Sequence, residues 1–360
     1  MRIALLHYSA PPIVGGVEAV MGHHARLMVQ DGHQVVIIAG RGGPAGQGID
    51  FDEIPLADSR HPEILAAKAH LDQGRVPESF QGLVERLMEA LSTSLRGADC
   101  LIAHNVCSLN KNLPLTAALH EISQRSAAPR LILWHHDLAW RTPRYRAELH
   151  DGYPWDLLRT AWSSVTQVTI SAFRRRELAE LFAITEDDIR VVPNGIDAGV
   201  FLKLGTQARG LISALRLEEA CPLFILPVRI TPRKNIELAL QVLAELRSRY
   251  PQAMLVVTGP LGPHNAANRD YFQKLVLLRH ELALEGSAHF LAERSGDYLP
   301  DETIHDLYRV ADALMLPSRE EGFGIPVLEA GLAGIPAFCA DIGPLHEVGG
   351  PFITYFSLDK

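Results

Sequence analysis

Short apolar runs alternate with longer amphipathic stretches along most of this chain. In the first half, the runs that predict strands cover residues 2–7, 34–39, 100–104, 130–134, 165–170 and 189–192. Segments with helical spacing, such as residues 17–30, lie between them. Most strand runs are continuous in apolar residues rather than alternating, which is typical of a parallel sheet with helices on both faces. The pattern therefore predicts a doubly wound α/β domain.

The rhythm stops at residues 193–197 (Pro-Asn-Gly-Ile-Asp) and restarts after Pro222. The second series predicts strands at residues 223–228, 253–258, 288–291, 313–316 and 336–339, and helices at 235–249 and 271–284. A chain of 360 residues exceeds the usual size of a single hydrophobic core. We therefore expect two Rossmann-like domains, at residues 1–197 and 198–360, with ligands bound beyond the carboxyl ends of their strands.

A glycine-containing loop follows the fourth predicted strand of the second domain. Residues 316–330 read Leu-Pro-Ser-Arg-Glu-Glu-Gly-Phe-Gly-Ile-Pro-Val-Leu-Glu-Ala. Pro326 suits the first turn of a helix, and Gly322 and Gly324 let the backbone approach a ligand closely. Because the amino end of a helix favours an anion, this loop predicts a diphosphate site.

Two glutamates, Glu321 and Glu329, stand in this stretch with seven residues between them. The arrangement resembles the signature of the large retaining glycosyltransferase family called group 1, of the GT-B fold class, which includes sucrose synthases, trehalose synthases and phosphatidylinositol mannosyltransferases. The resemblance implies that Glu329 holds the ribose of a nucleotide sugar and that Glu321 lies near the transferred hexose. It also assigns Gly322, Phe323 and Gly324 to donor binding.

A basic loop follows the first predicted strand of the second domain, where residues 227–236 read Pro-Val-Arg-Ile-Thr-Pro-Arg-Lys-Asn-Ile. It resembles the family's Arg and Lys pair, which places Arg229 and Lys234 on the donor diphosphate. Fixed cations stabilise the charge that develops on a departing nucleoside diphosphate. No metal and no cofactor besides the nucleotide sugar are therefore expected. Without the glutamate motif, a basic pair of this kind would be interpreted as part of a solvated loop.

Two glycines, Gly15 and Gly16, stand between the first predicted strand and the first helix. They do not make a dinucleotide fingerprint, because the third glycine, Gly22, comes too late. They resemble the family's Gly-Gly loop, whose amides face the donor phosphate and the acceptor. An ordinary turn before a helix remains the alternative.

Two histidines, His135 and His136, end a predicted strand of the first domain. The family places a histidine beside the transferred hexose at this point, and His136 aligns better than His135 with that position. The expected role is a hydrogen bond to a sugar hydroxyl or a backbone group, not proton abstraction. Either histidine could instead be a satisfied residue at a strand end.

Arginines gather after His136 in a chain whose formal net charge is −8. The plain interpretation is a solvated surface with local ion pairs. The functional interpretation is that Arg141 and Arg144 bind a phosphorylated or carboxylated acceptor, because the guanidinium offers such groups a planar pair of donors. We take these two as the predicted acceptor-binding residues.

Charge and composition exclude several other classes of protein. The net charge gives no general attraction to nucleic acid, although a local basic patch leaves peripheral membrane contact open. No apolar run reaches the length of a transmembrane segment. The four cysteines lack the paired spacing of zinc or disulfide sites, which favours a cytoplasmic protein. Asp50 and Asp52 imitate a metal-binding Asp-x-Asp motif but lie far from the donor motifs, so no metal site is predicted.

Together these features predict transfer of a hexose from a UDP-, GDP- or ADP-hexose to the hydroxyl of a small-molecule or glycan acceptor, with retention of configuration. The alternatives are a non-catalytic nucleotide-sugar-binding protein and a sugar-nucleotide epimerase of the same architecture. The context of the two glutamates argues against the epimerase. Members of the family usually continue beyond the position of Lys360, so we expect either truncation at the carboxyl end or a second sheet that closes differently.

Overall fold

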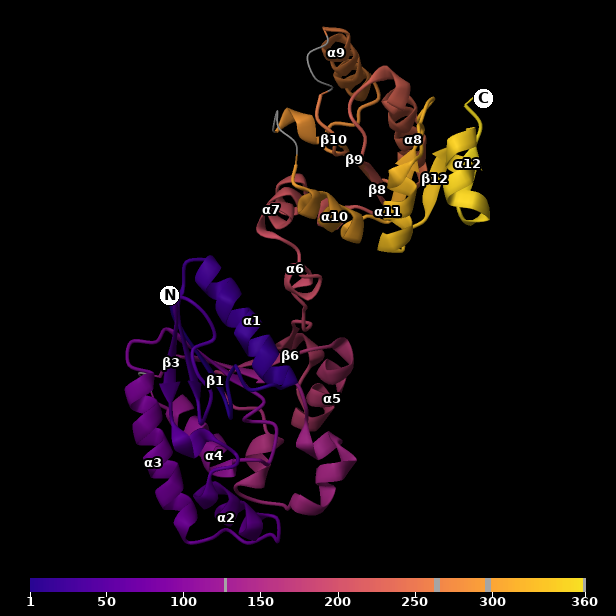
Figure 1. Cartoon of the computed structure of the whole chain (residues 1–360). Helices are drawn as coiled ribbons and strands as arrows, with labels where there is room; N and C mark the ends of the chain where they lie inside the picture. The colour runs from indigo at the N-terminus through magenta and orange to yellow at the C-terminus, as the bar shows by residue number, and fades with distance from the viewer. Residues whose placement is uncertain (126–127, 262–265, 295–298, 359–360) are drawn as a thin grey trace. The chain divides into compact units, whose positions relative to one another are not determined.

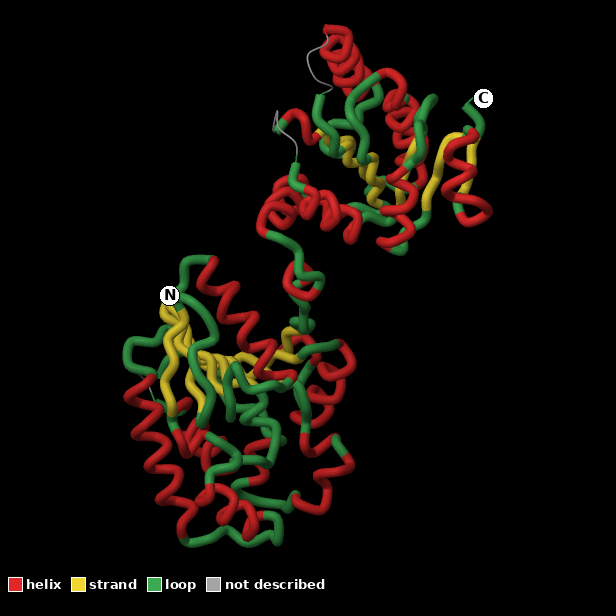
Figure 2. Tube along the Cα trace, viewed as in Figure 1, coloured by secondary structure: helices red, strands yellow, loops and turns green. Residues whose placement is uncertain are grey.

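In the computed structural model, the described residues are 1–125, 128–261, 266–294 and 299–358. The chain forms two compact units, Met1–Ile196 and Asp197–Lys360, so the division falls one residue before the expected one. Each unit is a parallel sheet with helices packed on it (Figure 1, Figure 2). This architecture confirms the predicted fold class of two Rossmann-like domains.

The sheet of the first unit has seven parallel strands in the order β3-β2-β1-β4-β5-β6-β7. Its strands are β1 (Arg2–His7), β2 (Gln34–Ala39), β3 (Ile49–Glu53), β4 (Cys100–His104), β5 (Arg130–His135), β6 (Thr166–Thr169) and β7 (Ile189–Val191). The six predicted strands are confirmed to within one residue at each end. The pattern missed β3, an edge strand in which Asp50 and Asp52 interrupt the apolar run.

The helices of the first unit are α1 (Gly16–Gln30), α2 (Pro62–Leu71), α3 (Ser79–Ser94), α4 (Leu113–Ser123) and α5 (Ala172–Phe182). They bury both faces of the sheet. Leu5 of β1 belongs to one core cluster with Met21 of α1, whereas the next residue, Leu6, belongs to another with Leu87 of α3. Because successive side chains of a strand point to opposite faces, burial on both sides explains the continuous apolar runs.

The sheet of the second unit has six parallel strands in the order β10-β9-β8-β11-β12-β13. Its strands are β8 (Leu223–Leu226), β9 (Met254–Val257), β10 (Ala288–Phe290), β11 (Ala313–Leu316), β12 (Ala337–Ala340) and β13 (Thr354–Phe356). The five predicted strands are confirmed to within two residues at each end. The sequence pattern left β13, which pairs with β12, unassigned.

The helices of the second unit are α6 (Ala198–Phe201), α7 (Thr206–Leu215), α8 (Ile236–Arg249), α9 (Ala266–Glu281), α10 (Asp301–Val310), α11 (Ile325–Ala333) and α12 (Gly343–Gly349). The predicted helix at 235–249 is confirmed, and α9 begins five residues before the start predicted for it. Among the helices of the described residues, none combines the length and the apolar character that crossing a bilayer requires.

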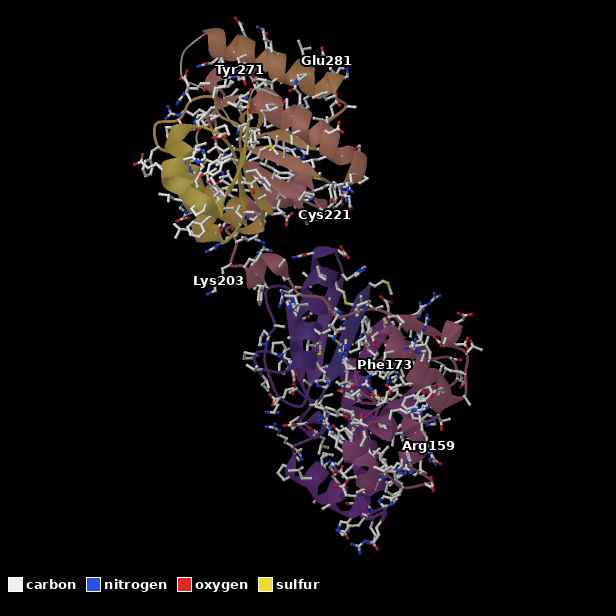
Figure 3. The ribbon with its side chains drawn as sticks, turned by 90° about the vertical axis from the view of Figure 1, so that its right-hand side faces the viewer. Arg159, Phe173, Lys203, Cys221, Tyr271 and Glu281 are labelled. Atoms are coloured by element: carbon white, nitrogen blue, oxygen red, sulfur yellow. The ribbon has the colours of Figure 1, made fainter. Side chains whose placement is uncertain are left out.

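Cysteines and tryptophans are unevenly distributed over the chain. The thiols of Cys100, Cys107 and Cys339 are buried, whereas Cys221 is exposed (Figure 3). The four tryptophans all belong to the first unit and are Trp134, Trp140, Trp155 and Trp162. Tryptophan fluorescence therefore reports on the first unit alone.

Candidate functional site

The predicted donor loop connects β11 to α11. Gly324 precedes the helix with a φ of +103°, a conformation that favours glycine. A Cβ added there would lie 2.5 Å from Leu345 Cδ2, so both the backbone conformation and the space require glycine. Pro326 occupies the first turn of α11, and Gly322 and Phe323 are exposed. The loop thus presents the amino end of α11 to solvent, where an anion can reach it.

A buried ion pair joins the two motifs that were predicted separately in the second unit. Lys234 Nζ donates to Glu321 Oε1 at 2.5 Å, and the two side chains are 10% and 8% exposed. Lys234 follows β8 and Glu321 follows β11, which are neighbouring parallel strands. Glu321 also faces the buried thiol of Cys339, whose pKa rises to about 12 through burial first and the charge of Glu321 second.

The loops after β8 and β11 are held together by further contacts. The backbone N–H of Arg319 donates to the carbonyl oxygen of Arg233 at 2.8 Å, and its guanidinium donates to Asn235 Oδ1 at 2.9 Å. Arg229 is exposed on the loop after β8. Gly259, after β9, comes so near this loop that an added Cβ would lie 1.9 Å from the Val228 carbonyl oxygen. The predicted basic and acidic residues therefore share one edge of one sheet.

Glu329 has a partner that sequence reasoning missed. Tyr308, on α10, donates to Glu329 Oε2 at 2.8 Å. Burial first, and the bond to Glu329 second, raise the pKa of Tyr308, which keeps the phenol protonated. In the sequence Tyr308 is one apolar position of an amphipathic helix, and nothing local marks it as the neighbour of a carboxylate.

The two predicted glycines of the first unit lie at the amino end of α1. Gly15 precedes the helix in an extended conformation that any residue adopts. A Cβ at Gly15 would lie 2.1 Å from the carboxylate of Glu18, which accepts a 2.6 Å hydrogen bond from Ser9 Oγ. A Cβ at Gly16 would meet nothing within 4 Å. The backbone around Gly16 is therefore open to a ligand, whereas the space beside Gly15 is taken.

His136 lies just beyond β5, within a cluster of imidazoles. Its Nε2 is 3.2 Å from Nδ1 of His104, and the His104 carbonyl oxygen lies 2.7 Å from His7 Nδ1. The ring of His24 packs against that of His104. Burial lowers the pKa of His136 to about 4, so the ring is neutral near pH 7. Among the described residues, no group of three or more His, Cys, Asp or Glu side chains could hold a metal ion.

His135, the alternative to His136, is the last residue of β5. It is buried, and its Nε2 lies 2.8 Å from Gln167 Oε1. Its Nδ1 is buried without a hydrogen-bond partner, so His135 is a buried strand-end histidine that is only partly satisfied. One sequence signal could have identified the neighbours of His136: β1, β4 and β5 each end in a histidine, namely His7, His104 and His135.

Arg141 and Arg144 are exposed residues of the short turns between β5 and β6. Arg141 pairs with Glu180 at 3.0 Å, and the guanidinium of Arg144 lies 4.7 Å from the ring centre of Tyr145. Contacts of this kind are what the plain interpretation expects on a solvated surface. The acceptor role of both arginines stays a prediction.

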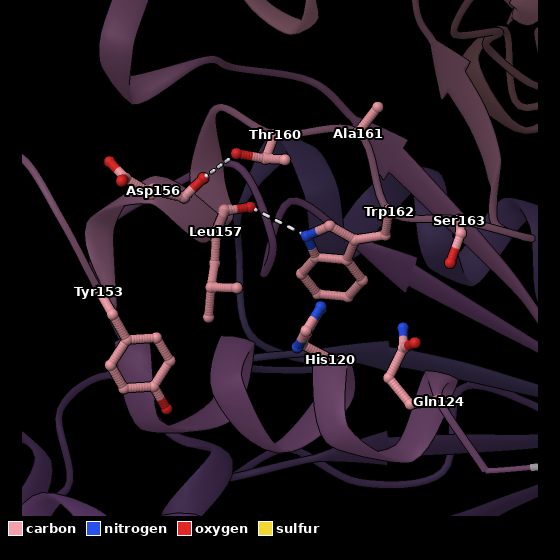
Figure 4. A pocket seen from close by; sticks show the side chains of 9 residues that line it. All are labelled: His120, Gln124, Tyr153, Asp156, Leu157, Thr160, Ala161, Trp162 and Ser163. Atoms are coloured by element: carbon pink, nitrogen blue, oxygen red, sulfur yellow. Dashed lines mark hydrogen bonds between the residues drawn. The ribbon is translucent and has the colours of Figure 1, made fainter.

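A cavity of about 400 Å³ lies elsewhere in the first unit (Figure 4). It is lined by His120, Gln124, Tyr153, Asp156, Leu157, Thr160, Ala161, Trp162 and Ser163. His120 and Gln124 lie at the carboxyl end of α4, and Trp162 lies in the segment that leads into β6. The cavity is therefore separate from the predicted residues, which follow the carboxyl ends of the strands.

Two family matches together span most of the chain. Residues 14–200 match Glycosyltransferase Family 4, and residues 212–358 match Glycosyl transferases group 1. The MMP alpha-(1->4)-mannosyltransferase of Mycolicibacterium hassiacum is 25% identical over 98% of this chain and 84% of its own length. The glycogen synthase of Mycobacterium tuberculosis is 25% identical over 96% of this chain and 80% of its own length.

Other similarities cover less or are weaker. The D-inositol 3-phosphate glycosyltransferase of Nocardia farcinica is 32% identical over 49% of this chain and 38% of its own length. Among solved structures, the Anabaena protein HepE in complex with UDP and glucose shares 18% identity at a TM-score of 0.36, over 100% of this chain and 86% of that chain. The match to Glycosyltransferase Family 4, over residues 14–200, alone spans more than half of the chain. This chain therefore belongs to the glycosyltransferases: it matches Family 4 over residues 14–200 and, over residues 212–358, the group 1 family that its two glutamates and its basic loop predicted.

Proposed function

We propose that this chain transfers a hexose from a nucleotide diphosphate sugar to an acceptor hydroxyl, with retention of configuration and without a metal ion. The observation that carries the proposal is the buried pair of Lys234 and Glu321. It brings a cation for the diphosphate and a carboxylate for the sugar to the carboxyl ends of two neighbouring strands. Ligands of open α/β sheets bind at such an edge.

In this proposal the leaving group is held by fixed positive charge. Lys234, Arg229 and the amino end of α11 would bind the diphosphate as the bond to the hexose ionises through an oxocarbenium-like state. An ammonium has three donors, so Lys234 can keep Glu321 as a partner while it donates to a phosphate oxygen. Glu321 would then lie beside the hexose, and Glu329 would accept hydrogen bonds from the ribose hydroxyls.

In this proposal the first unit supplies residues of its own. Gly15 and Gly16 are proposed to bind the donor, because the backbone at Gly16 is open to a ligand. His136 would offer a neutral imidazole to a sugar hydroxyl, in keeping with its pKa of about 4. No residue is assigned as a covalent nucleophile.

The test of this function is a panel of UDP-, GDP- and ADP-hexoses incubated with and without acceptors. Transfer would give a glycoside whose anomeric configuration, read by proton NMR, equals that of the donor. Binding without turnover would favour the non-catalytic alternative, and an epimerised donor would favour the epimerase.

We expect EDTA to leave the rate of transfer unchanged within about twofold, because the basic side chains supply the charge that a metal ion would otherwise provide. The measurement is the initial rate after dialysis against the chelator. Complete loss of activity that manganese restores would contradict this prediction. Asp50 and Asp52 would then become candidate metal ligands.

The acceptor is proposed to be anionic. The support is the position of Arg141 and Arg144 after His136, together with the similarity to the D-inositol 3-phosphate glycosyltransferase of Nocardia farcinica. A charge-assisted contact of about 1.5–3 kcal/mol corresponds to roughly tenfold to hundredfold in kcat/KM. Replacing both arginines with glutamine is expected to cost that factor with D-inositol 3-phosphate and little with inositol.

A control for this pair is Arg86→Gln, which removes another exposed arginine of the first unit, paired with Glu63. It should leave both acceptors unaffected. If the parent enzyme uses charged and neutral acceptors equally, Arg141 and Arg144 belong to the solvated surface.

A further inference from the structure

The carboxylate of Glu329 is held from outside its own helix. Tyr308 places its hydroxyl 2.8 Å from Glu329 Oε2 and 3.3 Å from the carbonyl oxygen of Pro326. The tyrosine is only 2% exposed, whereas Glu329 is partly exposed. A single buried hydroxyl thus connects α10 to the carboxylate and to the first turn of α11.

This contact restricts the ways in which Glu329 can meet a ligand. An ionised carboxylate has two oxygens with about four acceptor positions. With Oε2 bonded to Tyr308, rotation of the carboxylate is limited, and Oε1 has acceptor positions of its own for a ligand. The link to the Pro326 carbonyl oxygen also fixes this carboxylate relative to the helix amino end that would bind the diphosphate.

We propose that Tyr308 is a positioning residue that, through Glu329, makes the site prefer ribonucleotides over 2′-deoxyribonucleotides. The inference rests on the proposed function, because it takes the ribose hydroxyls as the ligand of Glu329. A site built to bond a hydroxyl rejects the analogue that lacks it, since its polar group is then left unpaired. The discrimination against the deoxy analogue weakens when the Glu329 carboxylate can rotate toward water, because it is then no longer left unpaired.

The test measures dissociation constants by calorimetry for UDP, GDP and ADP and for their 2′-deoxy counterparts, with the full chain. For the nucleotide that binds best, we expect the parent to prefer the ribose form by about tenfold or more. Tyr308→Phe removes one oxygen atom and is expected to reduce that preference about fivefold. In turnover, KM for the donor should rise while kcat changes little.

Tyr271→Phe is the matched control. Tyr271 lies in the same unit, its hydroxyl bonds the carboxylate of Glu237, and the N–H of Ile236 donates to it at 3.1 Å. Its loss should lower the melting temperature about as much as Tyr308→Phe does. It should leave the preference for ribose unchanged, because Glu237 has no assigned contact with the ribose.

Glu329→Gln distinguishes the two ways in which the inference can fail. If this variant keeps the parent's ribose preference, the ribose role of Glu329 is wrong and the inference fails with it. If Glu329→Gln loses the preference and Tyr308→Phe keeps it, the role of Tyr308 alone is overturned.

A measurement on the parent chain decides the matter if Tyr308→Phe does not fold. In a chain labelled with carbon-13 at tyrosine Cζ, the Tyr308 signal should shift more on adding UDP than on adding 2′-deoxy-UDP. Equal shifts would overturn the inference.

Discussion

Replacing Lys234 with alanine is expected to lower kcat/KM for transfer by about 10²- to 10³-fold, as removal of a preorganised donor to a developing anion does elsewhere. It should also destabilise the second unit by about 3–5 kcal/mol, because Glu321 is then buried without its partner. Initial rates with the best donor and urea unfolding followed by circular dichroism measure the two effects.

A second variant separates the two consequences. Adding Glu321→Gln to Lys234→Ala removes the unpaired charge, so stability should largely return while activity stays low. Lys274→Ala, an exposed lysine of α9, is the control and should change neither property. If the double variant regains activity along with stability, Lys234 serves the fold and not the diphosphate.

Acidification from pH 7 to pH 5 is expected to destabilise the first unit by several kcal/mol. Burial lowers the pKa of His7, His135 and His136 to about 4, against 6.5 in an unfolded chain. Below pH 6.5 the unfolded state therefore binds more protons, and stability falls as the pH drops toward 4. Each of these histidines should contribute roughly 2 kcal/mol of that loss at pH 5.

Tryptophan fluorescence during urea unfolding measures this effect in the first unit. His136→Gln should reduce the slope of unfolding free energy against pH between 6.5 and 4, because one proton uptake is removed. His70→Gln, on the exposed side of α2, should leave the slope unchanged. An unfolding free energy that stays constant from pH 7 to pH 5 would show that these imidazoles are not kept neutral by burial.

The sequence predicted strands well wherever burial made the pattern continuous. The ends of β1, β2, β4 and β11 are those of the apolar runs, since both faces of the sheets are covered. The failures have a physical cause. β3 lies at a sheet edge and carries two aspartates, and β13 is a three-residue edge strand, so neither needs an unbroken apolar run.

The candidate site was predicted as a set of motifs but not as a set of contacts. Local chemistry marked Pro326 as a helix start and Gly324 as a point of close backbone approach, and the resemblance to the family assigned roles to the charged residues. The pairing of Lys234 with Glu321 joins positions 87 residues apart, and that of Tyr308 with Glu329 joins two helices. Such pairs arise only when the fold packs separate segments of the chain against one another, which local patterns do not reveal.

Cys221 is a natural labelling site for measurements of fluorescence energy transfer in this chain. A maleimide dye would react first at this exposed thiol of the second unit, because the other three cysteines are buried. The tryptophans, which can donate excitation energy to such a dye, all belong to the first unit. The efficiency of energy transfer would then follow the separation of the two units in solution, with and without nucleotide, in the unaltered sequence.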